Sequence, residues 1–501
     1  MSFTLVAAAC RCSFLLIAII LAMYVFKCII RPYIAYLKYK NHPKVHVFGK
    51  FNLVYGDVIM NIRDSKRKKA AYHTYRKCLS KIKNKDIILY FEGYNPIFRM
   101  RSPQAIQQLQ NLIPDKVDRE PELLGFGKFN LKGMEYARSI SEQAISRKKT
   151  YIRLLALNSP SKHILSILSS LKNNMNTWKV NQEYDCHHEM KMIAMDMIFY
   201  IIFGNDLDRL NKDTKPFIRP DNTVQYMKFR QFYDEHSMIY YDCFRHPVSI
   251  LAPFINHYDL INPFIRARNN RSRFKEFIEH AIAISTDKDS VLYQMIHKEK
   301  LSNETIIDDL ITIFKSQSET VSHALMSMLY NLKKHSEVYT KLRTEIKSHF
   351  DEFPDIADRF SRDNILKLSY LHNVIKECFR YDTPAIESLR YRAYEDINIC
   401  DVDIPKDSLI HIDIHGLHYN SEQWIEPFKF IPERFDPDSQ YFLRPNSDKA
   451  RSSYAHASFS YGARACPGQT MAMLEIKIIV AYILSNIEYS IDEEMINKDD
   501  I

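Results

Sequence analysis

Apolar residues fill nearly every position from residue 4 to residue 26, with one interrupting charge at Arg11. A helix of this length crosses the ~30 Å hydrocarbon layer of a bilayer. The segment begins without a charge and is followed by Lys27 and Arg31, whereas a cleaved signal peptide begins with basic residues and has a shorter apolar stretch. Positive residues beside a spanning helix stay cytoplasmic. We therefore expect residues 1–31 to be a transmembrane anchor; the alternative is a buried core helix.

Beyond Pro32 most long segments carry apolar residues every three or four positions, which is the spacing of amphipathic helices. Short alternating stretches at residues 45–51, 397–404 and 408–414 predict strands. No Gly/Ser/Pro-rich linker and no internal repeat interrupts residues 45–501. We expect a mainly α fold with a small β part, formed by one domain over residues 32–501.

The clearest helical pattern covers residues 303–332. One apolar stripe recurs there at helical spacing, made of Leu310, Phe314, Val321, Leu325 and Leu329. A polar run, residues 316–320, interrupts the stripe halfway along the helix. Such a run predicts either a solvated turn or a functional break in the helix.

Composition and charge exclude several classes of protein. The 501 residues are 46% hydrophobic and 26% charged, which excludes a disordered chain and a disulfide-stapled miniprotein. Ten glycines are too few for a Gly-rich nucleotide fold. The net charge of +9 is spread without a long basic run, so it favours an acidic partner or a membrane surface over nucleic acid. The nine cysteines include no CxxC pair, which argues against a disulfide framework and a zinc ribbon.

The surroundings of Cys466 point to a ligand. Gly462 and Gly468 lie within seven residues of each other, although glycine is scarce, and an amphipathic helix is predicted directly afterwards at residues 470–484. Glycines let the backbone turn tightly around a sulfur and approach a flat cofactor. A thiolate at a helix N-terminus is stabilised by the helix dipole, and Arg464 supplies a cation for an acidic group.

Five residues of this loop, Phe459, Gly462, Arg464, Cys466 and Gly468, follow the pattern F-x-x-G-x-R-x-C-x-G. This pattern is the haem-binding motif of the cytochrome P450 family, which the chain therefore resembles. The resemblance implies a P450-type helical fold around a buried haem b (iron protoporphyrin IX). It implies that Cys466 is the proximal thiolate ligand of the iron and that Arg464 pairs with a haem propionate. Thiolate ligation pushes electron density toward the iron and favours O–O cleavage.

Further matches follow the order and spacing of the family. Glu377 and Arg380 resemble its E-x-x-R helix, with an i, i+3 spacing that lets both side chains pair on one face. Arg434, within a Pro-Glu-Arg-Phe run, resembles the residue that completes an ion-paired structural triad with them. Arg390 and Arg392 lie where the family places another propionate-binding arginine, and of the two we favour Arg392.

The polar run on the long helix carries the family's acid–alcohol pair at Glu319 and Thr320, which implies that these two residues deliver protons to dioxygen. The chain departs from the family at Ser316 and Gln317, where a small residue and a glycine are usual. Gln317 is therefore expected to narrow or rewire the oxygen groove.

The family's Trp-x-x-x-Arg signature is also missing. Its nearest fit runs from Lys149 to Arg153, which makes Arg153 a candidate for binding a propionate; a solvated basic helix end explains the same run.

Together these residues predict a haem-thiolate monooxygenase that inserts one atom of O2 into a small apolar molecule. The chain holds no flavin or nicotinamide domain, so an external NADPH-dependent flavoprotein reductase is expected to supply electrons. The anchor places the protein in a membrane, which we expect to be the endoplasmic reticulum with the catalytic domain facing the cytoplasm. Phe126 and Phe129 hint at an apolar substrate.

Two alternatives remain open at this stage. Some haem-thiolate family members rearrange or dehydrate peroxides without activating oxygen, but these tend to lack the acid–alcohol pair. A membrane-tethered helical binding or scaffold protein would explain the composition and the anchor, but not the glycine-flanked Cys466.

Overall fold

The computed structural model describes residues 18–48 (without 20 and 24), 82, 85–119 (without 93 and 94), 142–155, 160–245 and 262–492. The chain divides into two compact units. The first comprises residues 1–118, 387–416 and 501, and the second comprises residues 119–386 and 417–500.

The first unit is built on a six-stranded mixed sheet with the strand order β1-β2-β3-β10-β7-β4. In that order the strands are Val45–Val47, Ile87–Glu92, Asn95–Met100, Leu409–Ile412, Tyr391–Ala393 and Val117–Arg119. A second pair, β8 (Ile397–Ile399) and β9 (Val402–Ile404), forms an antiparallel hairpin. The helical elements are η1 (Phe26–Ile30), α2 (Arg31–Tyr39) and α5 (Pro103–Leu112), and α20 (Ile414–His418) begins in this unit.

The predicted strands are present, with shorter bounds. The pattern at residues 397–404 is a hairpin and not one strand, because Cys400 and Asp401 adopt left-handed φ angles of 53° and 63°. The pattern at residues 408–414 is β10, whose four residues are all buried. Residues 45–51 contain β1, and the last three of them lie outside the described residues.

Among the described residues, no helix combines the length and apolar character needed to cross a bilayer. Residues 1–17, 20 and 24 of the predicted anchor lie outside the described part of the chain.

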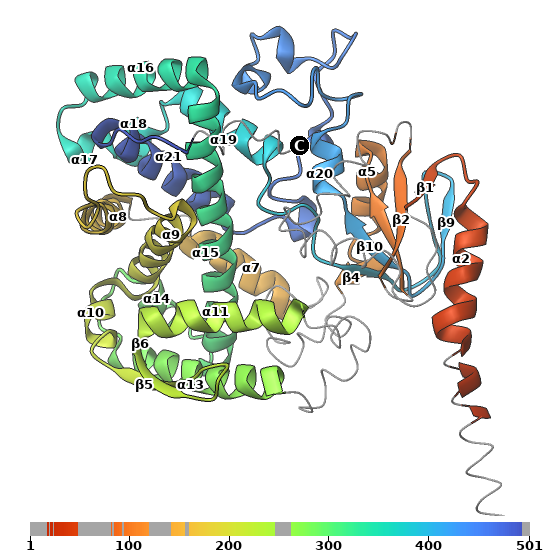
Figure 1. Ribbon diagram of the computed structural model, residues 1–501, viewed down its shortest axis with the longest axis horizontal. Helices are drawn as coiled ribbons and strands as arrows, with labels where there is room; N and C mark the ends of the chain where they lie inside the picture. The colour runs from red at the N-terminus through yellow and green to blue at the C-terminus, as the bar shows by residue number, and fades with distance from the viewer. Residues whose placement is uncertain are drawn as a thin grey trace, which may run out of the picture. The chain divides into compact units, whose positions relative to one another are not determined.

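The second unit is mainly helical, which confirms the predicted fold class (Figure 1). Its helices are α7 (Glu142–Leu155), α8 (Pro160–Met175), α9 (Cys186–Phe203), α10 (Leu207–Leu210), α11 (Phe229–Arg245), α13 (Asn262–Ile284), α14 (Val291–His297), α15 (Asn303–Lys334), α16 (Ser336–Glu352), α17 (Ile356–Arg359), α18 (Arg362–Ile365), α19 (Ser369–Tyr381) and α21 (Gln469–Asn486). Short 3-10 turns are η3 (Gly204–Asp206), η5 (Pro432–Phe435), η6 (Gln440–Phe442), η7 (Ser453–Ala455) and η8 (Gly462–Arg464), and β5 (Thr214–Ile218) pairs with β6 (Val224–Lys228).

The core of this unit lies around α15, which crosses it from end to end (Figure 1). Helix α9 packs along α15 and is apolar nearly all round, as expected for a helix enclosed by others. Aromatic rings fill the space between these helices; Phe314 of α15 meets Phe199 of α9 edge to face, with ring centroids 5.1 Å apart. Tight packing of this kind fixes the rotation of α15 about its axis, and so determines which residues reach each neighbour.

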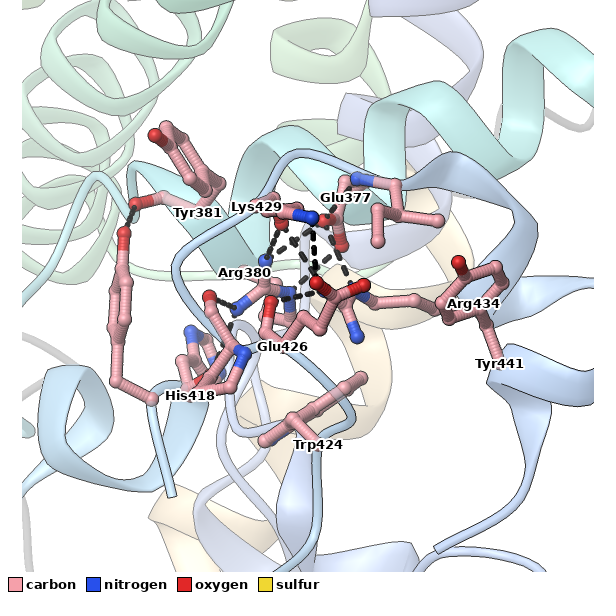
Figure 2. A network of polar contacts seen from close by, with 12 residues as sticks. Glu377, Arg380, Tyr381, His418, Trp424, Glu426, Lys429, Arg434 and Tyr441 are labelled. Carbon is pink, nitrogen blue, oxygen red and sulfur yellow. Dashed lines mark hydrogen bonds and ion pairs between the residues drawn. The ribbon is translucent and has the colours of Figure 1, made fainter. Parts of the chain in front are cut away.

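A long irregular segment connects α20 to α21, and a buried network of charges holds its first part (Figure 2). Glu377 and Arg380, both on α19, form two hydrogen bonds of 2.7 Å, and Nε of Arg434 donates to the same carboxylate at 3.2 Å. All three side chains are fully buried. The structure thus brings together the three residues that the sequence suggested as a triad.

The two arginines use their remaining N–H groups on backbone carbonyls of the irregular segment. Arg380 donates to the carbonyl oxygens of His418, Pro427 and Lys429 at 2.8 to 3.0 Å. Arg434 donates to those of Glu426 and Lys429 at 2.6 and 3.1 Å, and to Ile425. These bonds offset the desolvation of the charges and fix the path of the backbone.

Glu377→Ala and Arg380→Ala are each expected to lower the free energy of unfolding by about 3–5 kcal/mol, because a buried charge loses its partner. Chemical denaturation and the yield of soluble, folded protein measure the effect. Lys341→Ala is the control: Lys341 pairs with Glu433 at 2.8 Å but its side chain is 56% exposed, and its loss should cost at most about 1 kcal/mol. Glu377→Ala protein that folds with wild-type stability and yield would contradict the structural role of the network.

Candidate functional site

The loop before α21 turns back on itself around Cys466. The backbone N–H of Cys466 donates to the carbonyl oxygen of Phe459 at 2.8 Å and closes the loop. Gly462 adopts a φ of 57°, a left-handed conformation that favours glycine. The Phe459 ring meets Phe379 of α19 edge to face, with centroids 5.2 Å apart, and so ties the start of the loop to the core.

Gly468, the second glycine of the motif, has a backbone conformation that does not favour glycine. Gly468 has a φ of −90°, which any residue can adopt, and a Cβ there would meet Sγ of Cys466 at 3.9 Å, an ordinary contact. The backbone conformation of the loop therefore favours glycine at position 462 and not at position 468.

The sulfur of Cys466 lies at the start of α21, where it accepts hydrogen bonds from the backbone. Backbone N–H groups of Gly468 and Gln469, at the start of α21, donate to it. The residue is accessible to solvent, yet the protein atoms around the thiol still desolvate it and raise its pKa. The two N–H groups and the Lys148 ammonium act in the opposite direction, because they stabilise the thiolate.

Lys148 of α7 is a site residue that the sequence reasoning missed. Its ammonium donates to the carbonyl oxygen of Ala463 at 2.7 Å and to that of Gly462 at 3.4 Å, so it holds the Cys466 loop from the side. Burial and the neighbouring Arg464 both lower the pKa of Lys148. The signal in the sequence was a basic run beginning at Arg147, next to the incomplete Trp-x-x-x-Arg fit.

The other predicted cations lie elsewhere. Arg153, also on α7, is exposed and forms an ion pair with Glu299. Arg392 belongs to the first unit, on β7, where its guanidinium lies 3.5 Å from the carboxylate of Asp407. Phe126 and Phe129 lie outside the described residues.

The polar run of α15 is neither a solvated turn nor a break, because the helix continues through it without interruption. Ser318 is buried, and its hydroxyl lies 3.3 Å from that of Tyr233 on α11. Thr320 is exposed, and its hydroxyl donates to the carbonyl oxygen of Ser316 at 2.7 Å. Gln317 is buried and turns toward Glu475 of α21, with Nε2 and Oε2 3.4 Å apart.

Glu319 is joined to two other helices through a lysine. The Lys191 ammonium on α9 lies 3.3 Å from the Glu319 carboxylate and 2.9 Å from that of Asp234 on α11. Burial lowers the pKa of Lys191, but the two carboxylates outweigh it and the pKa is raised, so the lysine stays charged. Glu319 and the adjacent Thr320 thus combine a carboxyl group and a hydroxyl group, the two groups needed for a proton-delivery pair.

The donor set of this site fits a haem. A cysteine sulfur that accepts N–H hydrogen bonds at a helix start suits a soft, thiolate-binding metal, and Arg464 and Lys148 are cations suited to carboxylate groups. Helix α15 carries the Thr320 hydroxyl, and helix α21 begins at the Cys466 loop. The two helices pack against each other within the second unit.

Comparisons with known proteins agree with this chemistry. The family model of cytochrome P450 matches residues 58–500. The chain is 25% identical over 422 residues to cytochrome P450 3A28 of Bos taurus, an alignment that covers 80% of this chain and 77% of that protein. It is 25% identical to cytochrome P450 3A7 of Homo sapiens, in an alignment that covers 60% of this chain and 58% of that protein. It is 35% identical to cytochrome P450 4F5 of Rattus norvegicus, in an alignment that covers 38% of this chain and 34% of that protein. The chain therefore belongs to the cytochrome P450 family of haem-dependent monooxygenases.

Proposed function

We propose that Cys466 is the axial thiolate ligand of a haem b and that the enzyme inserts one atom of O2 into a small apolar organic substrate. The single observation that supports this most strongly is the Cys466 loop, in which two backbone N–H groups are directed at the sulfur of an exposed cysteine. Bound haem supplies the activation of O2, and a thiolate ligand favours O–O cleavage. The N–H groups and Lys148 stabilise the negative charge on that sulfur.

Arginine side chains are proposed to receive the haem propionates. Arg464 follows two residues after Gly462 and lies beside Lys148, which makes it the first candidate. Arg392 is the second. Arg153 stays a candidate from the sequence, although its guanidinium is paired with Glu299.

Thr320 and Glu319 are proposed to manage protons on the other helix of the site. The Thr320 hydroxyl donates to the Ser316 carbonyl, so its lone pairs stay available to hold a water or a protonated group. The Glu319 carboxylate lies 3.3 Å from the Lys191 ammonium, and its proposed role is to relay protons to that hydroxyl. This acid–alcohol pair also argues against a haem-thiolate isomerase or dehydratase, in which we expect no such pair.

The partner and the location complete the proposal. Residues 32–501 form the catalytic domain, and residues 1–31 anchor it to the endoplasmic reticulum membrane with the domain in the cytoplasm. An NADPH-dependent flavoprotein reductase delivers electrons, and the net charge of +9 favours docking of such an acidic partner. We propose no contact with nucleic acid.

Cys466→Ser is expected to abolish the thiolate-type absorption band of the reduced carbon-monoxide complex, and with it turnover, because a neutral hydroxyl cannot replace a charged soft donor. Cys186→Ser, at another exposed free cysteine, is the control and should keep the band. An unchanged band in Cys466→Ser would disprove the ligand assignment.

Deletion of residues 1–31 is expected to move the protein from the membrane fraction to the soluble fraction while the haem spectrum is retained, because the haem motif lies beyond the anchor. Fractionation of cells that express both forms measures the change. Full membrane association of the shortened protein would assign membrane binding to another surface.

Thr320→Ala is expected to retain haem but to release more peroxide per NADPH consumed, since proton delivery of this kind is typically worth ~10²–10⁴-fold. The reaction is measured with purified flavoprotein reductase. Thr344→Ala is a matched control, because Thr344 makes the same bond to a carbonyl one turn earlier, at 3.0 Å on α16. Equal peroxide yields in wild type and Thr320→Ala would mean that protons arrive by another route.

A further inference from the structure

A buried contact between α15 and α21 contains two polar side chains with incomplete hydrogen bonding. Gln317 is 7% exposed and Glu475 is fully buried. Nε2 of Gln317 lies 3.4 Å from Oε2 of Glu475, while Oε1 of each residue is buried without a hydrogen-bond partner. Two unpaired acceptors in one buried contact are costly if both are acceptors only.

A proton on Glu475 removes this cost. An ionised carboxylate is an acceptor only, whereas a protonated one carries an O–H donor. A proton on Oε1 of Glu475 can be donated to Oε1 of Gln317, which closes a ring of two hydrogen bonds between acid and amide. Burial is the dominant influence on this carboxyl and raises its pKa to about 8, which agrees with a neutral acid at pH 7.

We infer that Glu475 is protonated in the folded protein, that it forms a neutral acid–amide clasp with Gln317, and that this clasp positions the Thr320 hydroxyl relative to Cys466. The positioning role rests on the proposed function of Thr320, whereas the protonated acid and the clasp do not.

The clasp acts on Thr320 through the backbone. The peptide group between Ser316 and Gln317 carries the carbonyl oxygen that accepts the Thr320 hydroxyl, so fixing the Gln317 side chain also fixes that acceptor. At its other end, Glu475 lies on α21, whose first N–H group donates to the sulfur of Cys466. One rigid helix therefore connects the sulfur to the turn that carries the hydroxyl. Gln317, which departs from the family at a position where glycine is usual, is the residue that makes this connection.

Neighbouring residues of the same turn are tied to other helices. Ser318 meets Tyr233 of α11, and Glu319 meets Lys191 of α9. The Gln317–Glu475 contact adds α21, which is the helix that begins at the Cys466 loop. Loss of the clasp should leave the Ser318–Tyr233 and Glu319–Lys191 contacts intact. Helix α15 should then stay folded, while the turn at residues 316–320 is no longer held against α21.

The protonation state is tested directly by infrared spectroscopy at pH 7. The difference spectrum between wild type and Glu475→Gln should contain the carbonyl stretch of one protonated carboxylic acid, in protein with or without haem. Carboxylate bands in its place would disprove the protonated acid, whatever the outcome for activity.

The positioning role is tested by exchanging the partners. Gln317→Ala and Glu475→Ala should each raise the peroxide released per NADPH severalfold, with purified flavoprotein reductase. Glu475→Gln keeps a neutral pair, and Gln317→Glu/Glu475→Gln inverts acid and amide; both should retain nearly the wild-type ratio. Gln294→Ala, which removes a part-buried glutamine of α14, is the control and should also keep it.

The outcomes separate the alternatives. If the single alanine variants lose thermal stability but keep the wild-type peroxide ratio, the clasp is structural and the positioning role is wrong. If the inverted pair releases as much peroxide as the alanine variants, the acid–amide geometry is not what matters, and the proposal is likewise wrong. If the alanine variants fail to fold, the inverted pair is compared with wild type: a nearly unchanged peroxide ratio supports the clasp, and a severalfold rise disproves it. A missing thiolate-type carbon-monoxide band in wild type would instead count against the proposed function.

Discussion

The buried pairing of one carboxylate with two guanidinium groups is the constraint on which the site depends. Glu377 balances one of the two positive charges of Arg380 and Arg434, and all three side chains are fully removed from water. The remaining charge is compensated by the negative ends of backbone carbonyls between residues 418 and 429. Because these carbonyls must lie where the guanidinium groups point, the charges determine the path of a segment that has almost no regular secondary structure.

The same principle continues toward the cysteine. Arg451 donates to the carbonyl oxygens of Tyr441 and Phe442 at 2.6 and 2.7 Å, and its guanidinium lies 4.3 Å from the centroid of the Trp424 ring. Burial lowers its pKa to about 10, and the neighbouring Arg434 acts in the same direction, which shows how closely the cations are gathered. The Cys466 loop follows this segment and is then held by the contact of Phe459 with Phe379 of α19 and by Lys148 of α7.

These features explain what the sequence could and could not predict. The helix at residues 303–332 was predictable because its apolar stripe repeats over many turns, and the Cys466 loop because glycine is rare elsewhere. The β5–β6 hairpin was missed, since Val224 and Tyr226 are exposed apolar residues and give no two-sided pattern. Lys148 was missed because it meets Gly462 across 314 residues of sequence. The polar run on α15 was read as a turn or a break, since its partners lie on three other helices.

The central claim is that Cys466 binds the haem iron as a thiolate, and X-ray absorption at the iron edge of the haem-loaded protein tests it most directly. The account predicts one sulfur atom bonded to iron in the resting protein, and its loss in Cys466→Ser. An iron bound only by nitrogen and oxygen atoms in the wild-type protein would contradict it.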